Sequence, residues 1–116
     1  MRPFGYALEG LAYLVRTQRS FRIHLLVALA ALVAGVAAGL SAVEWAILVV
    51  TIAQVIMTEG LNTGLELAVS LASPERRPEA KAAKDIAAGA VLLSAIASIG
   101  VGVALFGPRV MALFRP

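Results

Sequence analysis

Two carboxylates and an amide lie close together in a segment that is otherwise apolar: Glu59, Asn62 and Glu66. Ionisable side chains within a membrane-spanning helix are costly and usually functional. The spacings put all three side chains on one helical face, with the carboxylates about 10 Å apart along the axis at ~1.5 Å rise per residue. The pattern therefore predicts a polar stripe that does chemistry.

Each member of this stripe has a functional and a structural interpretation. Glu59, the deepest, is either a hydrogen-bonding group or a general base poised near neutral pH, and its costly position favours the base. Glu66 lies nearer the following loop, where Mg²⁺ and phosphates have access, and carboxylate oxygens are ligands that Mg²⁺ prefers. Asn62 either orients a carboxylate or satisfies a neighbouring helix by hydrogen bonding.

The elements that must position these residues are predicted to be membrane helices. Of 116 residues, 60% are apolar, and the mean hydropathy is +0.90, which a small soluble domain could not bury. Residues 25–43 and 86–108 carry no charge, and each run is close to the ~20 residues that a bilayer-crossing helix needs. Residues 45–58 make a full span only if the helix continues through the polar stripe to residue 73.

We therefore expect an all-α fold with a single membrane domain over residues 1–116. An amphipathic helix at 3–19 would lie along the interface, because apolar residues recur there at helical spacing. Three spans would follow at 22–43, 45–73 and 78–107. Prolines at positions 74 and 78 separate the last two, since proline ends one helix and is tolerated in the first turn of the next.

Basic residues predict the orientation of these spans. They gather before the first span and between the second and third, which favours a cytoplasmic N-terminus and second loop; Arg109 and Arg115 oppose this trend on the far side. The net charge of +3 needs no nucleic-acid partner, because basic residues at a membrane face meet anionic lipid headgroups. Cysteine is absent, so disulfides and thiol nucleophiles are excluded.

Other polar positions indicate no site by their spacing alone. Lys84 and Asp85, at the mouth of the third span, suit interfacial anchoring. We interpret His24 as an interfacial histidine, and Glu44-Trp45 as the opposite interface with an aromatic anchor. The sequence also lacks a glycine-rich phosphate loop and a nucleophile elbow.

Taken together, the motifs resemble those of the prokaryotic diacylglycerol kinase family, which includes undecaprenol kinases. The likeness runs from Tyr6 to about Ile96 in the family's order and spacing. It is carried by Glu59-x-x-Asn62-Thr63-x-x-Glu66, Phe21-Arg22-Ile23-His24, Glu44-Trp45, Ser73-Pro74-Glu75 and Ala83-Lys84-Asp85.

The resemblance implies an ATP-dependent and Mg²⁺-dependent lipid kinase of the bacterial cytoplasmic (inner) membrane. It would be a homotrimer of three-span subunits with the active site facing the cytoplasm. The γ-phosphate of ATP would move to diacylglycerol, giving phosphatidic acid, or to undecaprenol; we place diacylglycerol first, narrowly.

The resemblance also implies residue roles. Glu59 would be the general base, Glu66 a ligand of the metal that bridges the ATP phosphates, and Asn62 would help to hold this arrangement. The remaining ATP-binding residues would be Lys84 at the phosphates, Asp85 at the nucleoside, and flanking groups that a neighbouring subunit helps to supply: Tyr6, Glu75, Arg76 and Arg77.

One departure from the family pattern concerns the metal. Gln18 stands where the family commonly has a second metal-binding glutamate. An amide oxygen can ligate Mg²⁺ but brings no negative charge, so we expect either weaker metal affinity before ATP binds or a substitute carboxylate. Ser70 likewise stands where the family often has aspartate.

A different class of function is also open on the residues alone. A small proton-coupled transporter could use two membrane glutamates as proton or cation sites without ATP. It gives no reason for the polar cluster from Glu75 to Asp85. Nucleotide protection of that loop against proteolysis would favour the kinase, and proton-coupled efflux in vesicles would favour the transporter.

Overall fold

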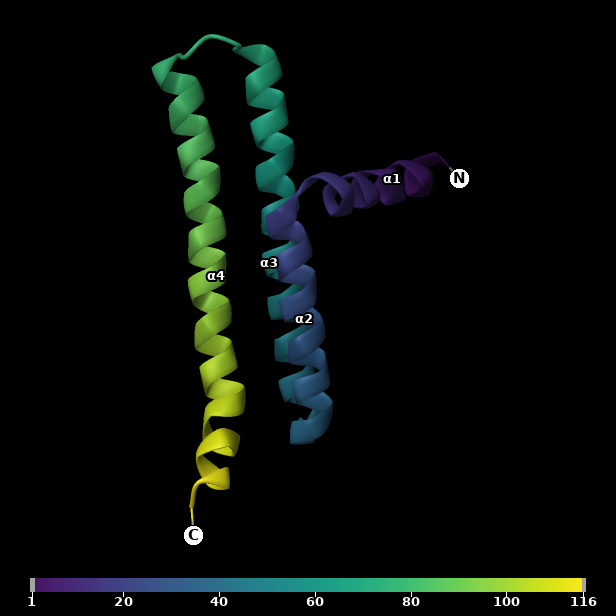
Figure 1. Ribbon diagram of the computed structural model, residues 1–116, viewed down its shortest axis with the longest axis vertical. Helices are drawn as coiled ribbons and strands as arrows, with labels where there is room; N and C mark the ends of the chain where they lie inside the picture. The colour runs from purple at the N-terminus through teal and green to yellow at the C-terminus, as the bar shows by residue number, and fades with distance from the viewer. Residues whose placement is uncertain (1, 116) are drawn as a thin grey trace.

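The computed structural model describes residues 2–115, and the chain is all-α over that range. Four helices follow one another: α1 (Arg2–Thr17), α2 (Arg19–Ala38), α3 (Ala42–Ala72) and α4 (Pro78–Leu113). By length and composition, α2, α3 and α4 could each cross a membrane, which confirms the expected set of spans. α1 leaves the bundle at a steep angle to the other three helices (Figure 1).

Local capping explains where the helices begin and end. α2 ends at Gly39, which adopts the left-handed conformation (φ 65°) and donates its N–H to the Gly35 and Val36 carbonyls. Ser41 and Glu44 then form a capping box that starts α3. The turn between α2 and α3 is therefore a few residues earlier than the apolar pattern predicts.

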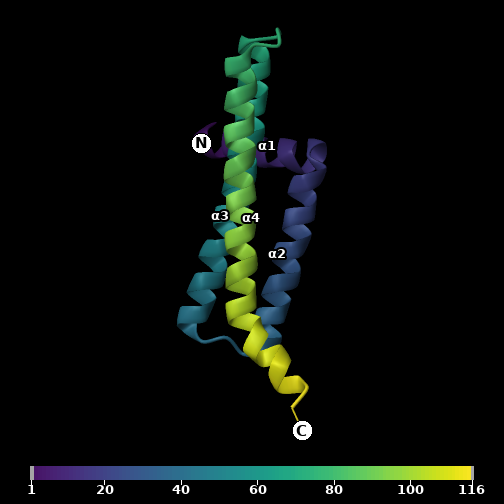
Figure 2. The ribbon, with the colours of Figure 1, turned by 90° about the vertical axis from the view of Figure 1, so that its left-hand side faces the viewer.

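α4 is longer than its predicted range. It begins at Pro78, whose missing N–H costs nothing in a first turn, and it continues to Leu113. Pro108 lies inside the helix, where it removes one backbone hydrogen bond. The end of α4 turns aside from the helix axis in this region (Figure 2), as expected for a proline kink.

The α3–α4 hairpin is longer than a bilayer is thick. With 31 and 36 residues, the two helices extend about 46 Å and about 54 Å, against ~30 Å of hydrocarbon. Both run on past the level at which α1 meets α2, and their connecting loop lies beyond it (Figure 1). If α1 lies along the interface as predicted, the outer turns of the hairpin lie in water.

The three long helices are held together by few buried side chains. Leu40, Leu48 and Leu105 form the core cluster, with Trp45 packed against it. Gly35 allows this packing, because a Cβ there would lie 2.8 Å from the Trp45 ring. Most large apolar side chains face outward, which suits contact with lipid or with other copies of the chain.

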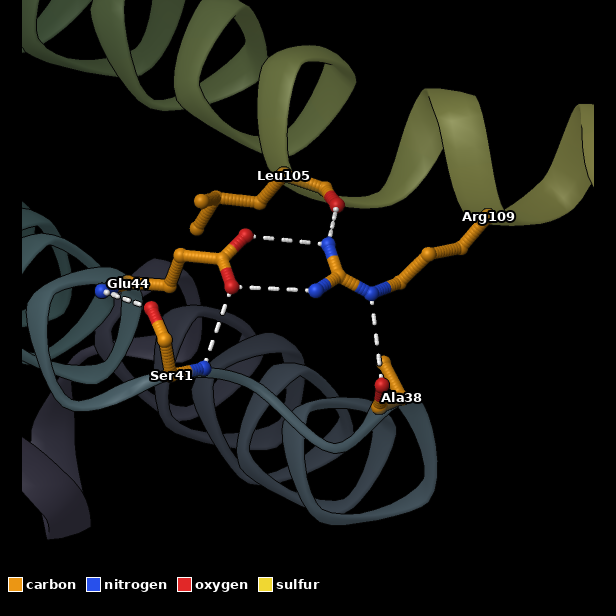
Figure 3. A network of polar contacts seen from close by, with 5 residues as sticks. All are labelled: Ala38, Ser41, Glu44, Leu105 and Arg109. Carbon is orange, nitrogen blue, oxygen red and sulfur yellow. Dashed lines mark hydrogen bonds and ion pairs between the residues drawn. The ribbon is translucent and has the colours of Figure 1, made fainter.

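A charged cluster joins the helices at the end opposite the hairpin loop (Figure 3). Arg109 of α4 makes two 3.0 Å hydrogen bonds to the carboxylate of Glu44 on α3, a bidentate pair. Its Nε also donates to the Ala38 carbonyl of α2 at 3.2 Å. The sequence placed Arg109 on this side as an unexplained positive charge, and the structure supplies its counterion.

Candidate active site

Glu59 is buried between α3 and the beginning of α2. Its residue surface is 5% exposed, and its Oε1 accepts a hydrogen bond from Ser20 Oγ at 2.5 Å. On the other oxygen, Oε2 lies 3.6 Å from Nε2 of His24. Ser20 and His24 are four residues apart on α2, so one face of that helix approaches both carboxylate oxygens.

Asn62 and Glu66 form the outer part of the polar stripe. Asn62 Nδ2 donates to Glu66 Oε1 at 3.2 Å, one helical turn away on α3. Asn62 Oδ1 is buried without a hydrogen-bond partner, whereas Glu66 is exposed. A buried, unpaired amide oxygen is unusual and costly, so this atom is available to a donor or a cation.

A second polar region surrounds the loop between α3 and α4. A cavity of about 660 Å³ there is open to the surroundings, and it contains five of the residues predicted to bind ATP. Four basic side chains outweigh two acidic ones along its wall, which suits phosphate groups. Its lining is Ser70, Ser73, Pro74, Glu75, Arg76, Arg77, Pro78, Ala80, Lys81, Lys84 and Asp85.

Two ion pairs organise the charged groups in this cavity. Lys81 Nζ lies 2.5 Å from Asp85 Oδ2, and Arg77 Nε lies 3.0 Å from Glu75 Oε2. Both pairs are exposed, so their side chains can exchange partners at little cost. Lys81 was missed as a site candidate, although its spacing of four residues from Asp85 was visible in the sequence.

Glu59 and the loop cavity are separated along the same helix. From Glu59 to Ser70, where the cavity begins, α3 advances about 16 Å at ~1.5 Å per residue. Asn62 and Glu66 lie between these two points. A ligand that uses both ends must therefore be extended, with its reacting group toward Glu59.

Two predicted site residues, Tyr6 and Gln18, make no hydrogen bond to the polar stripe within residues 2–115 and do not line the loop cavity. Tyr6 is 66% exposed on α1, which approaches α3 only near Leu14 and Gly60 and otherwise leads away from the hairpin (Figure 1). Gln18 follows α1, and its side chain donates to Thr17 Oγ1 at 3.3 Å. Its assignment as a metal ligand stays a prediction.

The acidic residues set a limit on metal binding. Within residues 2–115, the structure brings together no group of three or more His, Cys, Asp or Glu side chains that could hold a metal ion. Mg²⁺ is commonly held by one or two carboxylates together with substrate phosphates. Glu66 and the unpaired Asn62 Oδ1 are oxygen atoms of the stripe that could share a cation with phosphate groups.

An apolar cavity lies on the other side of Glu59 from the loop. It has a volume of about 450 Å³ between α2, α3 and α4, and small or apolar side chains form most of its wall. His24 belongs to this wall and also lies beside the Glu59 carboxylate. The cavity therefore brings an apolar space up to the buried carboxylate.

Sequence reasoning missed Ser20 and His24 as part of this site. His24 was interpreted as an interfacial side chain, and Ser20 was not considered. The sequence does show that Ser20 and His24 are four residues apart, on either side of Phe21. The structure buries Phe21 to 2% exposure. That spacing predicts a shared face of α2 but does not reveal what the face contacts.

Comparisons with known proteins show which family the chain resembles. The family model for prokaryotic diacylglycerol kinase matches residues 5–106. Undecaprenol kinase of Bacillus subtilis (strain 168) is 39% identical over 108 residues, which cover 93% of this chain and 88% of that protein. Diacylglycerol kinase of Synechocystis sp. is 44% identical over 111 residues, which cover 95% of this chain but 63% of that protein.

Proposed function

The chain belongs to the prokaryotic diacylglycerol kinase family, and from this premise we propose that it transfers the γ-phosphate of ATP to the hydroxyl of a membrane lipid alcohol. The observation that carries the proposal is a buried carboxylate, Glu59, between an apolar cavity and a basic, polar one. The family membership confirms the expected lipid kinase, and the transporter is set aside because both relatives are named kinases.

Glu59 is the general base in this proposal. A base must lie within hydrogen-bond reach of the proton that it removes, and a lipid hydroxyl enters from the apolar side. The apolar cavity ends at His24, next to Glu59, and its lining of alanine and aliphatic side chains suits a hydrocarbon chain. Burial of the carboxylate also keeps water from competing with the lipid for the phosphate.

The nucleotide lies along the outer hairpin in this proposal. Lys84, Arg76 and Arg77 neutralise the phosphates, and Asp85 and Glu75 contact the nucleoside end. Phosphoryl transfer needs mainly positioning and charge neutralisation, so these few side chains suffice. Tyr6 completes the nucleotide site from a neighbouring subunit, since α1 carries it away from its own hairpin.

Glu66 would be the main protein ligand of an Mg²⁺ ion that accompanies ATP, with Asn62 and Gln18 as further oxygen donors. When bound, the ion would supply positive charge that neutralises the phosphate oxygens. The hydrogen bond from Asn62 to Glu66 supports this role, because it orients the carboxylate while leaving its second oxygen available.

The site faces the cytoplasm in this proposal, because ATP is found there and the basic residues favour that side. α1 lies along the same interface, with its arginines at anionic headgroups. A homotrimer in the bacterial inner membrane accounts for the outward-facing apolar side chains and for the displaced Tyr6.

Two acceptors follow from the relatives. Diacylglycerol stays first, because the relative of that name has the higher identity. Undecaprenol is the second candidate, because the relative of that name is matched over 88% of its length.

The test is transfer of labelled γ-phosphate from Mg-ATP to each alcohol, side by side, in mixed lipid micelles. Glu59→Gln is expected to abolish turnover while nucleotide binding remains, since the amide cannot take a proton. Full activity in that variant would remove Glu59 as the base. Absence of transfer to either alcohol by folded wild-type protein would contradict the proposed reaction itself.

A further inference from the structure

His24 has no role in the reaction described so far, yet it lies beside the proposed base. Its Nε2 is 3.6 Å from Glu59 Oε2, while Ser20 donates to the other oxygen, Oε1. The Ser20 hydroxyl therefore uses one acceptor position of Oε1, and Oε2 is the carboxylate oxygen that accepts no hydrogen bond within residues 2–115. That oxygen is the one that faces the imidazole.

A buried base must also release the proton that it accepts. The Glu59 side chain is 7% exposed, whereas the His24 side chain is 25% exposed and lies in the second turn of α2, close to the helix end at which α1 meets it. Every turnover leaves one proton on the carboxyl, and water has little direct access to it. An imidazole gains and loses protons near neutral pH, which makes it a suitable carrier from a buried group to water.

No other side chain around His24 offers the same route. The residues that share its cavity come from α2, α3 and α4, and His24 is the one ionisable side chain among them. The hydroxyls of Thr51 and Ser98 in that wall donate to carbonyls of their own helices, Ile47 and Ala95. Glu59 is the acidic group that the structure places beside His24, at 3.6 Å.

We propose that His24 takes the substrate's proton from Glu59 and releases it to water at the membrane interface. The inference rests on the proposed function, in which Glu59 is the base. During transfer, the lipid O–H bond breaks as its oxygen bonds to the γ-phosphorus and ADP leaves, and the proton goes to Glu59 Oε2. It then moves to Nε2 of neutral His24, and loss to water restores both groups.

The separation of 3.6 Å is compatible with this step. Catalytic hydrogen bonds are often long before substrates bind, and one bridging water also spans such a distance. His24 acts through Glu59, so it is a positioning and proton-carrying residue and does not touch the reacting phosphate. Ser20 assists by keeping Oε2 directed toward the imidazole.

The test compares steady-state kinetics of His24→Gln and His24→Ala with those of the wild type. His24→Gln should lower kcat about 10- to 100-fold, while KM for Mg-ATP and for the lipid stays within about twofold. Added imidazole should restore part of the His24→Ala rate and none of the Glu59→Gln rate. Thr58→Val, a matched change next to Glu59 on α3, should keep wild-type kcat.

Several outcomes would overturn the inference. A kcat within about twofold of the wild type in His24→Gln would mean that Glu59 releases its proton directly to water. A loss that imidazole does not restore in His24→Ala, or that Thr58→Val reproduces, would assign His24 a structural role.

A second measurement covers the case in which the His24 variants do not fold. The chain has one histidine, so its ¹⁵N imidazole signals are unambiguous. They should differ between the wild type and Glu59→Gln but not between the wild type and Glu66→Gln. Unchanged signals in Glu59→Gln would overturn the inference. The proposed function fails separately, if wild-type protein transfers no phosphate or Glu59→Gln retains full activity.

Discussion

Glu59 and Glu66 lie on one face of α3, yet they have different surroundings. α2 begins beside Glu59 and covers it, so this carboxylate is buried against Ser20 and His24. α2 does not extend to Glu66, which is exposed and bonded to Asn62. Because α2 covers only the first of these positions, Glu59 is buried and suited to proton transfer, whereas Glu66 is exposed and suited to binding a cation.

Position 18 allows a direct test of the metal site. Gln18→Glu is expected to lower the Mg²⁺ concentration that gives the half-maximal rate, because a carboxylate adds a negative charge to the ligand set. The measurement is the phosphorylation rate against Mg²⁺ at fixed ATP. An unchanged Mg²⁺ dependence would mean that position 18 is outside the metal shell.

The sequence alone was enough to recognise the polar stripe on α3, but it did not reveal which residues of other helices the stripe contacts. The free-energy cost of a carboxylate in an apolar helix predicts that Glu59 is functional. Its contact with Ser20 spans 39 residues of sequence, and nothing in a single sequence indicates which faces of two apolar helices meet. His24 consequently seemed an ordinary interfacial side chain until α2 was placed against α3.

At the scale of the helices, one glycine sets how closely α2 meets the start of α3. Gly35→Ala is expected to destabilise the fold by about 1–3 kcal/mol, because the added Cβ would lie 2.8 Å from Trp45 Cη2. Gly64→Ala is the control: nothing lies within 4 Å, so it should be neutral or stabilising by up to about 1 kcal/mol. Reversible unfolding in mixed micelles gives both values. Equal effects would mean that contact with Trp45 is unimportant.

The Arg109–Glu44 pair clamps α4 to the α2–α3 turn. Arg109→Met is expected to lower the free energy of unfolding measurably, since Glu44 and the Ala38 carbonyl lose their hydrogen bonds to the guanidinium. A double-mutant cycle with Glu44→Gln should give a coupling energy of similar size. Arg115→Met, at the exposed C-terminal end, should have no measurable effect. A coupling near zero would make the bidentate pair incidental.

Helix number and type followed from the sequence, whereas helix ends depended on local hydrogen bonds. Apolar runs revealed three spans, and the polar stripe was recognised as part of the second. The α2–α3 turn was placed late because its position depends on the left-handed Gly39 and the Ser41 capping box, not on hydropathy. The third span was predicted to end at residue 107, just before Pro108. In the structure α4 continues past this proline to Leu113, because a proline can bend a helix without ending it.

For the whole molecule, the position of α1 bears on how subunits share a site. Tyr6 is about 12 Å along α1 from Leu14, where that helix approaches α3. In the proposed homotrimer, Tyr6 would therefore reach the nucleotide site of a neighbouring subunit.

Subunit mixing tests this arrangement. Tyr6→Ala and Glu59→Gln should each be impaired alone, and co-reconstitution should recover activity, because some mixed sites receive an intact residue from each chain. Glu59→Gln mixed with Glu66→Gln should recover none, since both residues lie on one α3. Absence of recovery in the first mixture would place Tyr6 outside the shared site, and crosslinking reports whether trimers formed.

The uninterrupted length of α3 and α4 has a mechanical consequence. By their length, the same two helices can cross the hydrocarbon layer and still carry the loop cavity beyond it, and each is one continuous helix from end to end. A span that is too long for its bilayer tilts to hide its excess length. If α3 and α4 tilt together as a rigid body, the loop at their far end moves sideways. Acyl-chain length in the surrounding membrane would thus affect where the loop cavity, the proposed nucleotide site, lies relative to the lipid headgroups.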